Sequence, residues 1–365
     1  MKTFVFAALM AFLFLSCKKH NDNNSSNDTT DAQISVGADF TLVLKTDKTA
    51  WATGINANGQ LGDGSTTNKN APVKILDNVK LVSAGANHSL FLKTDNTLWA
   101  CGNNQFGALG DGTTTNKTIP VKVMDNVKAM VAGFLYSLIL KTDNSLWGCG
   151  YNITGQLGDG TLVSKQAPVK IMDNVMSISS FEYHSLILKT DNSVWAAGNN
   201  GNGQLGDGTV TAKPTPVKIM DNVKAIAVGD YHSLFLKQDN TLWACGFNIN
   251  GQLGDGTKTD RHTPVKILDN VKAIAASYHT LILKTDNSLW ACGENLYGQL
   301  GDGTLTDRLT PVKVLDGVKA ISAGYNNSFA IKTDNTIWGA GTNKNGALGD
   351  GSNQDRTSFV KMYLP

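Results

Sequence analysis

The sequence predicts an all-β protein, a seven-bladed β-propeller with four antiparallel strands in each blade. Three observations predict it. Seven tryptophans recur in steps of 48 residues, with one step of 47: Trp51, Trp99, Trp147, Trp195, Trp243, Trp290 and Trp338. Each repeat holds four short apolar segments bounded by Gly, Asn or Asp, which favours strands over helices. Four strands in each of seven repeats are typical of a propeller, whose ring leaves only short edges, so the tryptophans are interpreted as structural.

The chain begins with a segment typical of an export signal. Lys2 precedes twelve apolar residues, 4 to 15, a run too short to span a bilayer as a helix. The run leads into Ser16 and Cys17, which resemble a bacterial lipobox, although Phe14 stands where that motif usually has Leu. The sequence therefore predicts a lipoprotein signal peptide over residues 1–16 and lipid attachment at Cys17. The alternative is an ordinary secreted protein in which Cys17 has no such role.

Residues 18 to 31 are polar and offer nothing that a core would bury. This composition predicts a disordered tether over residues 17–31. We therefore expect an exported protein, lipid-anchored to a bacterial membrane and touching it through the lipid alone. The outer membrane is favoured, on its periplasmic or its cell-surface side.

The repeat that starts at Val79 shows the four expected strands, named A to D in chain order. They cover residues 81–85, 88–93, 98–102 and 120–123. Thr94-Asp95-Asn96 predicts a tight turn between B and C, and the glycines of 107–113 predict a compact loop between C and D. We expect residues 32–365 to form one propeller domain built from seven such units.

Each glycine-rich loop carries one aspartate at a common position, Asp111 in this repeat. One carboxylate per loop is too few for calcium, and the loop lacks the lysine and the helix of a phosphate-binding P-loop. We therefore expect no metal site and no cofactor. The formal charge of +2 comes without a basic stripe, so we expect no nucleic-acid partner. A monomer is expected.

Histidine and cysteine also recur at fixed repeat positions. The histidines are His88, His184, His232 and His279, and the other three repeats lack one there, which favours structural hydrogen bonding over ligand binding. The cysteines, Cys101, Cys149, Cys245 and Cys292, are expected to be buried free thiols, because equivalent points on different blades lie too far apart for a disulfide. Paired carboxylates and a nucleophile elbow are missing from the sequence pattern, so we expect no enzymatic activity.

The repeats resemble those of the RCC1 family over residues 34 to 365. Gly85-Ala86-Asn87-His88-Ser89-Leu90 matches the first part of the family's unit, and Trp243-Ala244-Cys245-Gly246-Phe247-Asn248 with Gly251-Gln252-Leu253-Gly254 matches the rest. Phe181 departs from the pattern at a glycine position, and Phe40, Tyr136 and Asn327 replace the histidine. The resemblance implies a closed ring, often fastened by pairing a C-terminal strand with the first blade. Residues 359 to 362 could supply that strand.

The founding member of that family is a nucleotide-exchange factor for a small nuclear GTPase. Such activity depends on features added to the propeller, so the resemblance gives guanine-nucleotide exchange the weakest support here. Bacterial relatives in an exported setting include an inhibitor of β-lactamases that presents aromatic loops, which is the better analogy.

A meander of strands A to D puts the A–B and C–D loops on one face, here called the loop face, and the B–C and D–A turns on the other, the turn face. The turns hardly vary between repeats, whereas the loops vary and carry large apolar side chains. The candidate partner-binding residues are Phe106, Phe134, Leu135, Tyr151, Tyr183, Tyr231, Phe247, Tyr278, Tyr297 and Tyr325, with Leu296 beside them.

Aromatic side chains among small polar residues are typical of interface centres. The sequence therefore predicts a non-enzymatic binding module of the cell envelope that recognises a protein or a polysaccharide through the loop face. Two alternatives stay open. The rings could pack only loop against loop, or the propeller could act as an assembly scaffold of the envelope through its sides or its turn face.

Overall fold

The computed structural model describes residues 33–37, 40–343, 348 and 350–362 of the chain. The predicted signal peptide, Cys17 and the tether lie outside the described residues. No helix among the residues described has the length and apolar character needed to cross a membrane.

The strands follow the four-part repeat predicted from the sequence. Strand A of the seven blades is β1 (Gln33–Val36), β5 (Val79–Ala84), β9 (Val127–Ala132), β13 (Val175–Ser180), β17 (Val223–Val228), β21 (Val271–Ala276) and β25 (Val318–Ala323). Strand B is β2 (Phe40–Leu44), β6 (His88–Lys93), β10 (Tyr136–Lys141), β14 (His184–Lys189), β18 (His232–Lys237), β22 (His279–Lys284) and β26 (Asn327–Lys332).

The outer half of each blade is equally regular. Strand C is β3 (Ala50–Gly54), β7 (Leu98–Gly102), β11 (Leu146–Gly150), β15 (Val194–Gly198), β19 (Leu242–Gly246), β23 (Leu289–Gly293) and β27 (Ile337–Gly341). Strand D is β4 (Lys69–Leu76), β8 (Lys117–Met124), β12 (Lys165–Met172), β16 (Lys213–Met220), β20 (Arg261–Leu268), β24 (Arg308–Leu315) and β28 (Arg356–Lys361).

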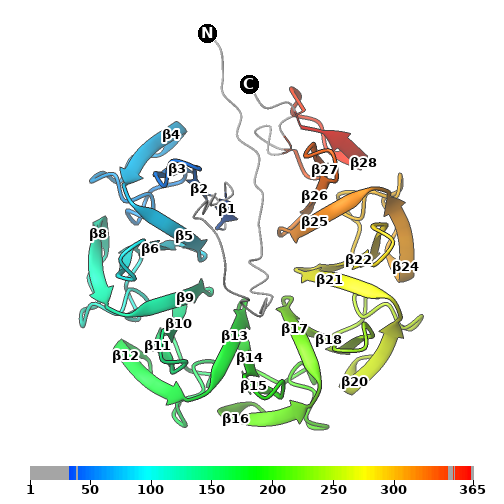
Figure 1. The fold of residues 1–365 in the computed structure, drawn as a ribbon, viewed down its shortest axis with the longest axis horizontal. Coiled ribbons are helices and arrows are strands. Elements are labelled where there is room, and N and C mark those ends of the chain that lie inside the picture. The colour runs from blue at the N-terminus through cyan, green and yellow to red at the C-terminus, as the bar shows by residue number, and fades with distance from the viewer. Residues whose placement is uncertain (1–32, 38–39, 344–347, 349, 363–365) are drawn as a thin grey trace, which may run out of the picture.

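Each repeat forms one antiparallel sheet in the order A-B-C-D, and the seven sheets are blades 1 to 7. The A strands face the middle of the ring and the D strands form its rim (Figure 1). The protein is therefore an all-β, seven-bladed propeller with four antiparallel strands per blade, which confirms the predicted fold class.

Backbone hydrogen bonds connect neighbouring blades on the turn face. Asn96 in the B–C turn of blade 2 adopts a φ of 67°, a conformation that asparagine tolerates. The carbonyl of Asn96 accepts a hydrogen bond of 2.9 Å from the backbone N–H of Val127, where blade 3 begins. Equivalent bonds recur between other successive blades, as from Val175 to Asn144. The near-identical turns thus connect neighbouring blades.

Six buried hydrophobic clusters each combine residues of two successive blades. Between blades 1 and 2, for example, Leu42 and Leu61 meet Phe91 and Cys101, and Trp99 packs against them. Burial of this kind is the main stabilising term in a repeat protein, because one blade alone cannot cover its apolar faces.

Cys101 and Cys245 lie in these clusters. All four repeat cysteines are free and buried, as predicted, and the Sγ of Cys101 lies 3.6 Å from the carbonyl oxygen of Gln60 in the preceding blade. Burial raises the pKa of the Cys101 thiol well above its usual range. A thiol held protonated in this way is chemically inert.

A buried polar bridge accompanies the apolar contacts at most seams. His88 Nε2 lies 3.0 Å from Ser137 Oγ of the next blade, and Ser137 donates its only proton to the carbonyl of Ala108, 2.7 Å away. The serine oxygen must therefore accept from an Nε2–H. Burial lowers the pKa of His88 to about 4, so the imidazole is neutral at physiological pH and carries its proton on Nε2. The same bridge starts from the other histidines, His184, His232 and His279.

The bridge explains the glycine three residues before His88 and His232. A Cβ on Gly85 would stand 2.5 Å from the Cε1 of His88 and 2.5 Å from the carbonyl oxygen of Gly133. Glycine thus lets the imidazole lie flat against the backbone. In blade 3, Tyr136 takes the place of the histidine and its hydroxyl lies 3.1 Å from the carbonyl oxygen of His184.

The aspartate of each glycine-rich loop has a structural role. Asp111 Oδ1 accepts hydrogen bonds from Asn104 and from the backbone N–H of Thr113, and Oδ2 pairs with Lys117 at 3.2 Å. Each of the seven aspartates pairs in this way with a lysine or arginine at the start of strand D: Asp63, Asp111, Asp159, Asp207, Asp255, Asp302 and Asp350. Partial burial works to raise the pKa of Asp63, but bonds from Lys69 and Ser65 outweigh it and lower the pKa to about 2.

The tryptophans hold a fixed position on strand C. The Nε1 of Trp99 donates to Thr97 Oγ1 over 2.9 Å, and Lys93 Nζ lies 5.4 Å from the ring centroid. All seven tryptophans have such a lysine. Their cation–π contacts are part of the scaffold.

The C-terminal strand does not close the ring as the family resemblance implied. Strand β28, which includes Phe359, pairs with β27 in its own blade, and β1 pairs with β2. Strand β1 is the A strand of the first repeat and β28 is the D strand of the last, so each blade consists of a single repeat. The seventh cluster, Phe329, Leu348 and Met362, lies within blade 7, so blades 7 and 1 share no buried cluster among the described residues.

We expect the Gly85→Ala substitution to lower the free energy of unfolding by about 1–3 kcal/mol, because the added methyl group displaces His88 from the seam. Chemical denaturation followed by circular dichroism measures this loss. Gly201→Ala is the control, because the Cβ there meets only Asn199 Oδ1 at 3.6 Å. Equal effects of the two substitutions would contradict the explanation.

We expect local opening to begin at the seam between blades 7 and 1, since the residues described there form no shared buried cluster. In native-state hydrogen exchange, the amides of β2, β3, β26 and β27 should exchange faster than those of β10, β11, β14 and β15. Uniform exchange over all blades, or earlier exchange in blades 3 and 4, would show that the ring is closed as firmly at its ends as elsewhere.

Candidate binding face

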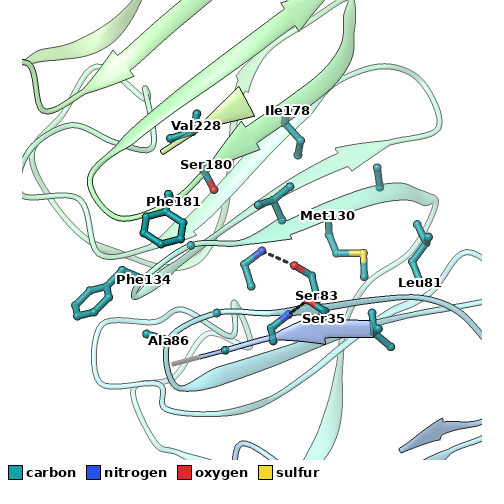
Figure 2. A pocket seen from close by; sticks show the side chains of 18 of the residues that line it. Ser35, Leu81, Ser83, Ala86, Met130, Phe134, Ile178, Ser180, Phe181 and Val228 are labelled. Carbon is teal, nitrogen blue, oxygen red and sulfur yellow. Dashed lines mark hydrogen bonds between the residues drawn. The ribbon is translucent and has the colours of Figure 1, made fainter. Parts of the chain in front are cut away.

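A pocket with a volume of about 190 Å³ lies on the axis of the ring. It is lined by residues from all seven blades, mainly on strand A, including Ser35, Leu81, Met130 and Ile178. Ser35 Oγ accepts the N–H of Ala84 at 2.9 Å, and Ser83 Oγ accepts the N–H of Ala132 at 3.0 Å (Figure 2). Serine hydroxyls thus join neighbouring A strands where no sheet connects them.

The mouth of this pocket at the loop face is aromatic. Phe134 and Phe181 lie at one end of the pocket, away from Leu81, Met130 and Ile178 (Figure 2). The ring of Phe181, from blade 4, has its centroid 5.1 Å from that of Tyr325 in blade 7. Because these blades are not neighbours in the ring, this contact crosses the mouth.

Two further ring pairs lie round the mouth, and with Phe181 and Tyr325 they form what we call the aromatic arc. Tyr278 contacts Tyr325 at 5.7 Å between centroids, and Phe134 contacts Tyr183 at 5.9 Å. These pairs join the A–B loops of blades 6 and 7 and of blades 3 and 4. Edge and tilted arrangements at these distances are favourable for aromatic rings.

Eight of the ten candidate residues take part in such pairs, since Phe106 contacts Tyr151 at 4.8 Å and Tyr231 contacts Phe247 at 6.2 Å. The structure therefore brings them together on one face. They are half-buried, so each ring packs on another while part of its residue stays exposed. Leu135 is also half-buried, and Tyr297 is 36% exposed.

The structure shows exposed aliphatic side chains on this face, and only Leu296 among them was predicted from the sequence. Ile153 is 56% exposed, Ile249 53% and Leu296 64%. Each is the third residue after the glycine that ends strand C, so the repeat register could have revealed Ile153 and Ile249. The sequence prediction missed them because it selected aromatic residues.

Two carboxyl groups were also missed. The side chains of Glu182 in blade 4 and Asp230 in blade 5 lie within hydrogen-bonding reach of each other. Asp230 is only 7% exposed. Burial, and then the charges of Glu182 and Glu294, raise the pKa of Asp230 to about 8. Burial also raises the pKa of Glu182. At neutral pH the pair therefore holds a shared proton.

The pair lies among the tyrosines of the A–B loops. Burial, followed by the charges of Asp230 and Glu182, raises the pKa of Tyr231 to about 12 and raises the pKa of Tyr278 further. Sequence reasoning passed over Glu182 and Asp230 because they occupy the variable loop position before a tyrosine. The available signal was composition: Glu182 and Glu294 are the only glutamates in the chain.

A family model described as the RCC1-like domain matches residues 16–276 and 77–364. The chain belongs to the RCC1-like domain family. The family assignment agrees with the resemblance of its repeats and with the seven-bladed ring. A search of the curated proteins found no match.

Solved structures with the same fold include a yeast and a human protein. Yeast RCC1 (Prp20) bound to Kap60 superposes with a TM-score of 0.75 at 21% identity, covering 98% of this chain and 91% of that one. Human WBSCR16 gives a TM-score of 0.72 at 24% identity, covering 83% of this chain and 88% of that one. Identities this low show a common fold only.

The Glu182–Asp230 pair of this RCC1-like propeller should reduce its stability at high pH. The folded-state pKa of Asp230 is raised above the unfolded value, so the folded state binds more protons and stability falls as pH rises from about 4 to about 8. We expect Asp230→Asn to raise the free energy of unfolding by about 1–3 kcal/mol at pH 9, where the amide can donate to the Glu182 carboxylate.

Denaturation at pH 5 and at pH 9 measures this effect, and the gain should shrink at the lower pH. Asp125→Asn, at an exposed ion pair with Lys122, is the control and should give no such gain. A loss of stability in Asp230→Asn at pH 9 would show that the aspartate is not repelled by its neighbour.

Proposed function

We propose that this RCC1-like propeller is a non-enzymatic binding module of the bacterial cell envelope, anchored by lipid at Cys17, and that its loop face binds a protein. The observation that carries the proposal is the aromatic arc round the pocket mouth. Exposed Ile153, Ile249 and Leu296 lie in the C–D loops of the same face. Half-buried rings that are held in place lose little entropy on binding and suit an interface centre.

The distribution of reactive side chains supports a binding role over catalysis. The four repeat histidines are neutral and bonded in the seams, and the described cysteines are buried. The seven loop aspartates are paired with lysine or arginine. The scaffold thus occupies these histidines, cysteines and loop aspartates.

The comparisons support a protein as the partner. Yeast RCC1 (Prp20) has been crystallised bound to Kap60, and the binding of Prp20p to Gsp1p and histones has been described. The sequence's near-neutral charge adds little electrostatic steering, so recognition here would rest on shape and aromatic contact.

The binding face is tested by a pull-down from detergent-solubilised envelope. We expect the Tyr231→Ala/Tyr278→Ala variant to capture at least tenfold less partner than the wild type, because it removes two rings of the mouth. Thr94→Ala/Thr142→Ala, on exposed turn-face positions, is the matched control and should capture as the wild type does. Circular dichroism confirms that both variants fold. Equal capture by the tyrosine variant would place binding elsewhere.

The anchor is tested by Cys17→Ser. We expect this variant to move from the membrane fraction to the soluble fraction, since the lipid is the only membrane contact in the proposal. Fractionation, with metabolic labelling by a fatty acid, measures the change. Unchanged membrane association of the variant would contradict lipidation at this residue.

A further inference from the structure

The Glu182–Asp230 pair is unlike the other acidic groups of the propeller. Every ion pair of the described residues uses an aspartate of the C–D loop or of the D–A turn, as with Asp63 and Asp77, and none includes Glu182 or Asp230. The A–B loops contain no lysine or arginine in the sequence. The pair therefore has no lysine or arginine of an A–B loop to neutralise its charge.

Asp230 is also incompletely bonded. Its Oδ1 is buried and has no hydrogen-bond partner in the described part of the chain. Its backbone N–H bonds to the carbonyl of Ser277 in blade 6, while its side chain reaches Glu182 in blade 4. Asp230 of blade 5 thus contacts both blade 4 and blade 6 on the loop face. A buried carboxylate oxygen without a donor is costly unless a ligand supplies one.

Tyrosine rings stand round the pair. Burial, and with it the charges of Glu182 and Asp230, raises the pKa of each of Tyr183, Tyr231 and Tyr278. Tyr183 and Tyr278 belong to the aromatic arc through Phe134 and Tyr325, and Tyr231 contacts Phe247. The face of a tyrosine ring carries negative potential and attracts cations. Carboxyl groups and tyrosine ring faces therefore both favour a cation as the ligand.

We propose that Glu182 and Asp230, ringed by Tyr183, Tyr231 and Tyr278, form a binding site for the guanidinium group of an arginine side chain on a protein partner. This inference rests on the proposed function and names the chemistry that the partner brings to the loop face. The arginine would supply the donors that the pair lacks and would release the shared proton to solvent.

Arginine fits the site better than other cations. Its planar fork can bond two carboxylates at once and can stack on a tyrosine face, whereas a lysine ammonium is a compact and strongly hydrated charge. Calcium needs six to eight oxygen ligands. No group of three or more metal-binding side chains occurs among the residues that the structure describes.

Release of the proton couples binding to pH. The groups that act on Asp230 are Glu182 and Glu294, and Tyr183, Tyr231 and Tyr278 surround it. Because the pKa of Asp230 is raised to about 8, the pair is doubly ionised only above that pH. Arginine should therefore bind more tightly at pH 9 than at pH 6, by at least tenfold.

The direct test is a titration of the full-length chain in detergent with N-acetyl-arginine methylamide, followed by NMR of tyrosine ring signals. The matched probe is N-acetyl-citrulline methylamide, which has the same shape without the charge. We expect the citrulline probe to bind at least tenfold more weakly. We also expect Glu182→Gln and Asp230→Asn each to weaken arginine binding at least tenfold at pH 9, with Asp125→Asn unchanged.

Equal binding of the two probes, or unchanged binding in the folded Glu182→Gln and Asp230→Asn variants, would overturn the arginine site. Tighter binding of N-acetyl-lysine methylamide than of the arginine probe would also overturn it. These outcomes are independent of the envelope pull-down. If the pull-down shows a partner that needs Tyr231 and Tyr278 while the arginine probe fails, the binding face stands and this inference falls. If the probe binds while no partner needs the face, the arginine site stands and the proposed function falls.

Discussion

The contact between successive blades is the constraint on which the rest of the structure depends. At its centre a neutral imidazole such as that of His88 donates to Ser137 of the next blade, and the serine donates back to a carbonyl of the first. Glycine at position 85 makes room for the ring, and the same seam buries Leu90, Leu92 and Ile139 with Trp147 packed against them. Six seams bury an apolar cluster shared by successive blades, and four of them carry this imidazole bridge. Among the described residues, the seam between blades 7 and 1 shows no shared cluster.

This construction divides the molecule by function. Seams and turns use the repeated residues: His, Ser, the Asp-Asn turns and the loop aspartates with their lysine or arginine partners. The side chains of the A–B loops do not make these seam and turn contacts, so the composition of these loops can vary. There the chain places Phe181, Tyr231, Tyr278 and Tyr325 round a pocket mouth, together with a carboxyl pair that lowers stability at high pH. Groups that reduce stability without serving the scaffold are characteristic of functional sites.

Much of the fold followed from the sequence, because the 48-residue period and the turn residues are local signals. The four strands per repeat, the free cysteines such as Cys101, and the bonding role of His88 needed no long-range information. Ring closure did need it: strand phase decides whether β28 pairs with β27 or with the first blade, and sequence spacing does not fix phase. Pairing of Phe181 with Tyr325, and of Glu182 with Asp230, also depends on the angle between blades. The candidate aromatics were found one by one, but not their arrangement across the mouth.

The central claim is that the loop face recognises a protein in the envelope. Site-specific photo-crosslinking in living cells tests it most directly, with a photoreactive amino acid placed at exposed Ile153 or Leu296 on the loop face and at exposed Thr94 or Thr142 on the turn face. Substitution of exposed side chains leaves the seams intact. The account predicts one discrete adduct with the same partner from Ile153 and Leu296 and none from the two threonines. Adducts from Thr94 or Thr142 alone would contradict it and would favour a scaffold that works through the turn face.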